Sequence, residues 1–228
     1  SVVSFGTSYN DSRAKDIGGI ESYLAKQFPD YSVRRAFTSQ IIMNHILARD
    51  GEKIDNVEQA LERAKKNGVK ELIVQPTHLM QGKEYDELKE TLDKHKADFA
   101  KVALAEPLLG EVGKDAEEVN ADKEQVATLL VQAAVTDGGF ESVQKAGQDG
   151  VAFVFLGHGT SHTAAITYSE MQTAMRKLGY NNVFIGTVEG EPEETAVDAV
   201  IEAVKKAGYK KVTIRPMMVV AGDHAHND

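Results

Sequence analysis

The chain has 228 residues, of which 42% are hydrophobic, and its formal net charge is −9. This length allows one large domain or two small ones with a buried core. The acidic balance, without a Lys/Arg cluster, argues against nucleic acid and anionic membrane surfaces as partners. No apolar run approaches the roughly 20 residues that cross a bilayer. The sequence has no cysteine, which excludes disulfides and thiolate metal ligands.

Short apolar runs alternate with amphipathic stretches through the first part of the chain. The apolar runs predict strands, and they end at turn residues such as Gly6, Pro76 and Pro107. Between them, hydrophobic residues recur at the spacing of a helix face. The predicted strands are 2–5, 33–37, 72–74 and 102–105, and the predicted helices include 17–28, 57–64, 88–92 and 126–133.

The second half of the chain shows the same alternation. Strands are predicted at 151–156, 183–187 and 212–220, and helices at 165–178 and 193–207. The Gly- and Asp-rich stretch 137–150 is expected to be a surface connection. Strands that alternate with helices of this length indicate parallel sheets with helices on their faces.

Two pairs of segments indicate that the halves are duplicated. The stretch "SVVSFGTSYND" at 1–11 resembles "VAFVFLGHGTSH" at 151–162. The stretch 68–82 resembles 208–222, and its outer glycines are 14 residues apart in both copies. We therefore predict an α/β fold of two similar domains, each a parallel sheet flanked by helices. The predicted domains are 1–113 and 114–228, the second carrying the metal site.

Three strands of the second half are each followed by a His or Glu. His158 follows the first strand and Glu189 the second, while the third is followed by "AGDHAHND", with Asp223, His224 and His226; each lies in a glycine-containing turn. In open α/β sheets, ligands bind beyond the carboxyl ends of the strands. Two imidazoles and a carboxylate suit a borderline divalent cation such as Co²⁺, Ni²⁺, Fe²⁺ or Zn²⁺. Taken alone, His158 and Glu189 are each more typical of a polar loop, and "DHAHND" is equally typical of a polar turn. The convergence of these residues on one edge of the sheet predicts a shared metal site.

The first half offers a partial counterpart to this pattern. Phe5 stands where the second half has His158. The stretch "PTHLMQGKEYDEL" at 76–88 places His78, Lys83 and Glu84 after a strand. We expect the first half to supply walls and substrate contacts rather than a second metal site. A capped loop histidine is an equally good interpretation of His78.

Five motifs in a fixed order connect the chain to a known family. With "SFGTS", "QPTHLMQGKEYDEL", "GHGTSH", "GTVEGEP" and "VVAGDHAHND", it resembles the anaerobic-type cobalt chelatases of cobalamin biosynthesis, also called sirohydrochlorin cobaltochelatases. The resemblance runs from Ser4 to the last residue. It implies two similar α/β domains with the active site in the cleft between them. It also implies that His158, Glu189 and His224 hold the metal.

The resemblance implies ATP-independent insertion of Co²⁺ into sirohydrochlorin. This reaction needs a releasable cation, acceptors for two pyrrole N–H protons and a grip on the macrocycle. His158 and His224 are expected as ligands and bases, and Glu189 as a ligand that offsets the charge of the ion. No nucleotide is expected, because "GHGTSHT" lacks the Gly-Lys-Ser/Thr ending of a P-loop. The predicted substrate contacts are Thr7, Ser8, His78, Lys83, Glu84, Thr160 and Ser161.

Alternative functions stay open on the sequence alone. Because Fe²⁺ and Ni²⁺ share the ligand preferences of Co²⁺, an iron or nickel chelatase acting on a related tetrapyrrole is one alternative. A non-catalytic haem- or tetrapyrrole-binding protein is another. A homo-oligomer is also left open.

Family members continue through a helix-containing segment beyond Asp228, which suggests a fragment. We expect the cytoplasm, with the periplasm as the alternative, because the chain starts in a strand and a leader could have been removed.

Overall fold

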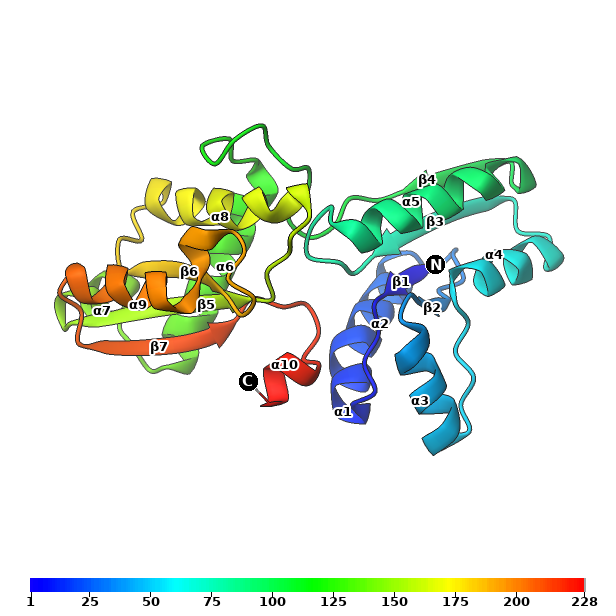
Figure 1. Cartoon of the computed structure of the whole chain (residues 1–228). Helices are drawn as coiled ribbons and strands as arrows, with labels where there is room; N and C mark the ends of the chain where they lie inside the picture. Colours follow the sequence, from blue (N-terminus) through cyan, green and yellow to red (C-terminus); the bar gives the residue numbers. More distant parts are fainter. Residues whose placement is uncertain (228) are drawn as a thin grey trace. The chain divides into compact units, whose positions relative to one another are not determined.

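A computed structural model describes residues 1–227, apart from the side chain of His224. Packing divides the chain into two units (Figure 1). Unit 1 comprises Ser1–Pro107 and the segment from Val219 onward, and unit 2 comprises Leu108–Met218. The predicted boundary at 113/114 lies a short way beyond Pro107, and the sequence prediction did not include the return of the last segment to unit 1.

Unit 1 is built on a four-stranded parallel sheet in the order β2-β1-β3-β4. Its strands are β1 (Val2–Ser4), β2 (Arg35–Phe37), β3 (Glu71–Pro76) and β4 (Lys101–Leu104). Its helices are α1 (Asn10–Ser12), η1 (Arg13–Ile17), α2 (Gly18–Gln27), α3 (Gln40–Asp50), α4 (Val57–Lys66), α5 (Lys83–His95), η2 (Lys96–Asp98) and α10 (Asp223–Asn227). The predicted α/β class with parallel sheets is confirmed.

Local sequence signals begin and end the helices of unit 1. Asn56 and Gln59 form a capping box at the start of α4, each side chain accepting the backbone N–H of the other. On one face of the sheet, α4 and α5 bury leucines against the strands. The core there comprises Val3, Ala36, Leu61, Leu72, Val74, Leu88, Leu92 and Phe99.

Unit 2 is built on a three-stranded parallel sheet in the order β6-β5-β7. Its strands are β5 (Val151–Gly157), β6 (Val183–Thr187) and β7 (Lys211–Pro216). Its helices are α6 (Ala121–Asp137), α7 (Val143–Gln148), η3 (Thr163–Ala165), α8 (Ile166–Lys177), η4 (Glu193–Thr195) and α9 (Val197–Lys206). Two expectations were wrong here. The stretch 137–150 contains α7, which buries Val143 and Ala146, and β7 ends at Pro216, short of the predicted end at 220.

The strand registers of the two units correspond, as the internal duplication predicts. Ser4 pairs with Phe37 in unit 1, and Gly157 pairs with Thr187 in unit 2. On the other side of the central strand, β3 ends at Pro76 and β7 ends at Pro216. Thus β1, β2 and β3 correspond to β5, β6 and β7, and α4 corresponds to α9.

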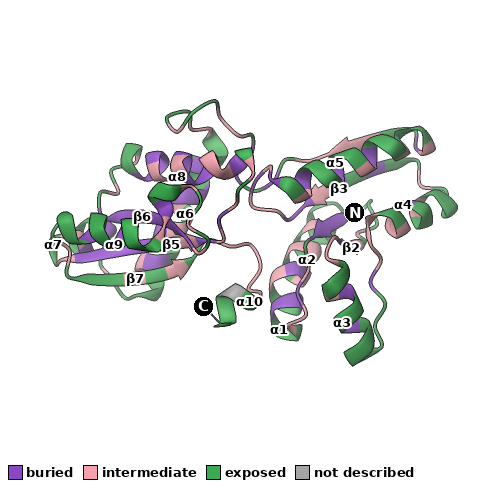
Figure 2. Ribbon diagram, in the orientation of Figure 1, coloured by how far each residue is buried: buried purple, intermediate pink, exposed green. Residues whose placement is uncertain are grey.

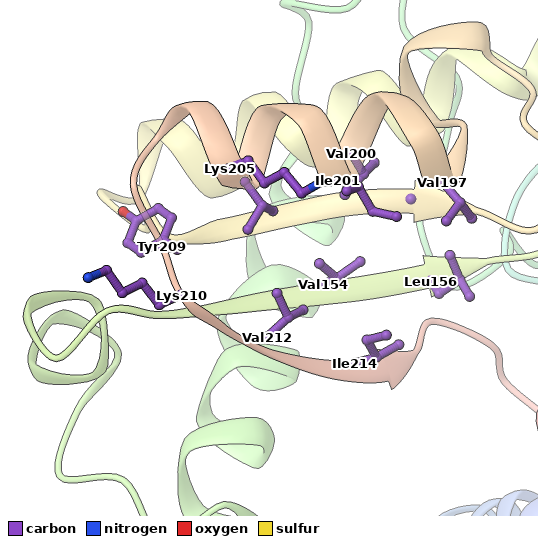
Figure 3. A pocket seen from close by; sticks show the side chains of 12 residues that line it. Val154, Leu156, Val197, Val200, Ile201, Lys205, Tyr209, Lys210, Val212 and Ile214 are labelled. Atoms are coloured by element: carbon purple, nitrogen blue, oxygen red, sulfur yellow. The ribbon is translucent and has the colours of Figure 1, made fainter.

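The face of unit 2 between α9 and β7 carries an apolar groove of about 320 Å³ (Figure 3). Ile214 of β7 is 66% exposed there, and Figure 2 shows that β7 is largely exposed. In unit 1, α5 covers the corresponding face, where Leu88 is only 2% exposed. The groove is lined by Val154, Leu156, Gly186, Val197, Val200, Ile201, Val204, Lys205, Tyr209, Lys210, Val212 and Ile214.

A buried ion pair fixes the first residues of unit 2. Lys123 of α6 and Glu170 of α8 are almost completely buried, with Nζ and Oε1 3.7 Å apart. Lys123 Nζ donates to the carbonyl oxygens of Leu109 and Glu111, at 3.1 and 2.6 Å. The N–H of Gly113 donates to Glu170 Oε2 at 2.9 Å. The segment 109–113 is therefore held against α6 and α8. Within the described part of the chain, no helix is both long and apolar enough to cross a membrane.

Candidate metal site

His158 and Glu189 follow neighbouring strands and are joined through their backbones. His158 comes directly after β5, and Glu189 comes two residues after the end of β6. The N–H of Glu189 donates to the carbonyl oxygen of His158 at 2.9 Å. One residue earlier, the N–H of Val188 donates to the carbonyl oxygen of Gly157, also at 2.9 Å. The ladder between β5 and β6 thus continues into the two turns and fixes the two residues side by side.

The side chains of His158 and Glu189 lie at a separation suited to a shared cation. His158 Nε2 and Glu189 Oε1 are 3.6 Å apart, and the side chains are 45% and 53% exposed. Two ligands with bond lengths near 2.1 Å in a tetrahedral complex lie about 3.4 Å apart. A divalent cation therefore fits between these atoms with little movement, and the exposure leaves room for further ligands.

The hydrogen bond of the imidazole indicates which nitrogen can bind metal. His158 Nδ1 lies 3.0 Å from the carbonyl oxygen of Gly159. A carbonyl oxygen only accepts, so Nδ1 carries the proton in this contact. In the neutral ring the lone pair is then on Nε2, the nitrogen that faces Glu189. A backbone carbonyl that holds the second ring nitrogen is a common partner of metal-binding histidines.

The backbone conformation and close packing at position 159 require glycine. Its φ angle is +90°, in the region that favours glycine. A Cβ at this position would lie 3.1 Å from Thr187 Cβ and 3.2 Å from the carbonyl oxygen of Glu191. The turn after β5 can therefore pack this closely on the turn after β6 only with glycine at 159.

The segment that carries His224 packs on unit 1, but the side chain of His224 is outside the described residues. The N–H of Ala221 donates to Asp16 Oδ2 at 2.9 Å, and Tyr9 Oη donates to Asp223 Oδ1 at 3.0 Å. The ring of His226 stacks on Tyr9 with 4.1 Å between centroids. Among the described side chains, no cluster of three His, Asp or Glu residues could hold a metal ion. The predicted third ligand therefore stays a prediction.

Comparison with known proteins decides the family. The family model described as cobalt chelatase (CbiK) matches residues 1–228. The chain belongs to the CbiK cobalt chelatase family. A sirohydrochlorin cobaltochelatase of Salmonella typhimurium is 34% identical over 230 residues, which cover 100% of this chain and 78% of the relative. The sirohydrochlorin cobaltochelatase CbiKC of Nitratidesulfovibrio vulgaris is 29% identical over 215 residues, which cover 90% of this chain and 66% of the relative. The resemblance stated from the five motifs is confirmed.

In this cobalt chelatase family member, the predicted hydroxyl contacts differ in exposure. Thr7 is buried, and its Oγ1 accepts the N–H of Tyr9 at 3.2 Å. Ser8 is half-buried. In unit 2, Thr160 Oγ1 accepts the N–H of His162 at 3.1 Å, and Ser161 is exposed. Thr7 and Thr160 therefore use their hydroxyls to shape the turns, while Ser161 faces solvent.

The remaining predicted contacts lie at the end of β3 and the start of α5. Both ring nitrogens of His78 are buried, and neither has a hydrogen-bond partner among the described residues. Burial lowers the pKa of His78, and the charge of Glu84 opposes that shift only in part. The imidazole of His78 is therefore neutral at neutral pH. Lys83 is exposed at the first position of α5, with Nζ 3.9 Å from Glu87 Oε1.

Proposed function

We propose that this chain inserts Co²⁺ into sirohydrochlorin without ATP. The proposal is supported by the family, by the activity in the names of both relatives, and by the donor pair of His158 and Glu189. The observation that carries it is the 3.6 Å separation of Nε2 and Oε1 beyond the ends of adjacent strands. His224 is proposed as the third ligand.

The donor pair suits a cation that must be given up again. Two or three protein ligands on a partly exposed site leave coordination positions for the nitrogens of the macrocycle. The carboxylate of Glu189 offsets part of the charge of Co²⁺ before transfer. When the cation moves to the macrocycle, the lone pair of His158 Nε2 becomes free to accept a pyrrole proton. His224 is proposed as the acceptor of the second proton, so that two protons leave as one divalent ion enters.

Binding of the tetrapyrrole is assigned to polar groups of both units. Sirohydrochlorin is a polycarboxylate and the chain is net acidic, so local donors must outweigh the overall repulsion. Exposed Lys83 and Ser161 are the donors most accessible to substrate carboxylates. The full set of proposed contacts is Thr7, Ser8, His78, Lys83, Glu84, Thr160 and Ser161.

The test is a spectroscopic assay of the purified protein with sirohydrochlorin and Co²⁺, Fe²⁺ or Ni²⁺ in turn. We expect His158→Ala and His224→Ala each to abolish insertion of Co²⁺ while circular dichroism stays that of the wild type. His45→Ala is the matched control, because His45 is an exposed histidine of α3. Near-normal insertion by either variant would show that its residue is not a ligand.

The same assay separates the alternatives. Faster insertion of Fe²⁺ or Ni²⁺ than of Co²⁺ would reassign the metal, since these ions share ligand preferences. Tight binding of the tetrapyrrole without metallated product would indicate a carrier instead of an enzyme.

A further inference from the structure

Tyr168 lies beneath the turn that carries His158. It belongs to α8 and is 3% exposed. Its hydroxyl oxygen accepts the N–H of Gly159 at 3.1 Å. A Cβ on Gly157 would collide with Cε1 of the Tyr168 ring. The absence of a side chain at 157 therefore makes the space in which the ring reaches the turn.

This hydrogen bond completes a clamp on one peptide group. The peptide between His158 and Gly159 has its N–H held by Tyr168 Oη and its carbonyl oxygen held by the N–H of Glu189, at 2.9 Å. With both ends held, the peptide plane cannot rotate freely. The next carbonyl, that of Gly159, accepts from His158 Nδ1 at 3.0 Å.

We propose that Tyr168 is a positioning residue, which orients the imidazole of His158 for the cation through Gly159. The proposal rests on the proposed function, because it takes His158 as a metal ligand. Partners that fix the orientation of a metal-binding histidine typically contribute 10- to 100-fold in metal affinity or activity. Tyr168 itself touches neither the cation nor the macrocycle in this role.

Loss of the hydroxyl has a defined physical effect. Gly159 is buried, and an unpaired buried N–H is costly, so the peptide must rotate or admit water. Rotation moves the carbonyl oxygen of His158 away from the N–H of Glu189. The two donor side chains then lose their common backbone support.

The test is Tyr168→Phe, which removes the hydroxyl and keeps the ring. Tyr209→Phe is the matched control, because its hydroxyl donates to the carbonyl oxygen of Asn181 at 3.5 Å, away from the turn. We expect the KM for Co²⁺ to rise about 10-fold or more in Tyr168→Phe, with a smaller change in kcat. Tyr209→Phe should leave both values unchanged.

A second readout follows the ring itself without metal. Nitrogen-15 NMR of His158, assigned by the signals lost in His158→Gln, should show one tautomer protonated on Nδ1 in the wild type. Tyr168→Phe should give a mixture of tautomers. A merely structural tyrosine would lower thermal stability without changing the tautomer or the KM.

Two results would overturn the proposal. One is a single Nδ1–H tautomer together with an unchanged KM in a folded Tyr168→Phe protein. The other, which needs no variant, is rapid hydrogen exchange of the Gly159 amide in the wild type. If the wild type showed no insertion of cobalt but the variant still changed the tautomer, the proposed function would fail while the positioning of the ring stood.

Discussion

The turn after β1 in unit 1 and the turn after β5 in unit 2 have similar backbone conformations but different side chains. Gly6 and Gly159 have φ angles of +100° and +90°. In the first turn the carbonyl oxygen of Phe5 accepts the N–H of Ser39 at 3.2 Å. In the second turn the carbonyl oxygen of His158 accepts the N–H of Glu189 at 2.9 Å. Unit 1 therefore has a phenylalanine and a serine at the positions where unit 2 has an imidazole and a carboxylate.

The difference between the turns separates what the fold needs from what the chemistry needs. Ser39 uses its hydroxyl to accept the N–H of Ile42 at 3.4 Å and cap α3. Glu189 instead faces His158, with its Oε1 3.6 Å from Nε2. A duplicated frame thus tolerates either pair of side chains, and under the proposed function only the pair of unit 2 binds the metal.

The largest effect should come from giving unit 2 the residue of unit 1. His158→Phe removes the imidazole but keeps a ring that the same turn accepts in unit 1. We expect insertion of Co²⁺ to fall by more than about 100-fold, beyond the loss usual for an outer partner of a metal ligand. Thermal unfolding should stay close to that of the wild type. The reverse change, Phe5→His, should leave insertion intact, and a comparable loss there would break the comparison.

The sheet face under α5 in unit 1 and the exposed face of β7 in unit 2 should differ in how much a truncated side chain lowers the free energy of unfolding. Leu88→Ala opens a cavity under α5, and we expect it to cost about 2–5 kcal/mol of unfolding free energy. Ile214→Ala, on the exposed face of β7, should cost less than about 1 kcal/mol. Urea unfolding of both variants measures the contrast. Equal costs would mean that the groove of unit 2 is covered in solution.

The smallest expected effect is on thermal stability and concerns His95 of unit 1, which pairs with two carboxylates. Burial acts to lower its pKa, but hydrogen bonds to Glu58 and Asp98, at 2.6 and 3.2 Å, outweigh burial and raise the pKa. A raised pKa stabilises the folded state below the unfolded value near 6.5, and this gain is lost as pH rises through the folded value.

The melting temperature should therefore fall in His95→Gln at about pH 5.5, by about 1–2 °C. At about pH 8.5 the variant and the wild type should melt together. A difference that grew with pH would contradict the ion-pair interpretation.

Much of the fold could be predicted because its signals are local. Apolar runs ended by Pro76 or by glycines marked strands, and the repeated turn sequences revealed the duplication. The residues after the strands were found by topology, since parallel strands end at one edge. That rule predicts that His158 and Glu189 lie at the same edge of the sheet, where the structure places them.

The parts that could not be predicted depend on contacts between distant residues. Nothing near Tyr168 in the sequence indicates that its hydroxyl reaches Gly159. The sequence shows a glycine at 157, but it does not show that the ring of Tyr168 occupies the space beside it. Lys123 and Glu170 would be expected in solvent, because charged residues are rarely buried without a partner. Only packing of α6 against α8 pairs them.

The bond from Glu189 N–H to the His158 carbonyl has a consequence for the speed of release. Because the main chain is tied at this point, the imidazole and carboxylate can separate by turning about their own χ angles alone. Exposed side chains rotate within picoseconds to nanoseconds, whereas loops take nanoseconds to microseconds. If His158 and Glu189 hold the ion as proposed, its departure from this pair requires no loop rearrangement.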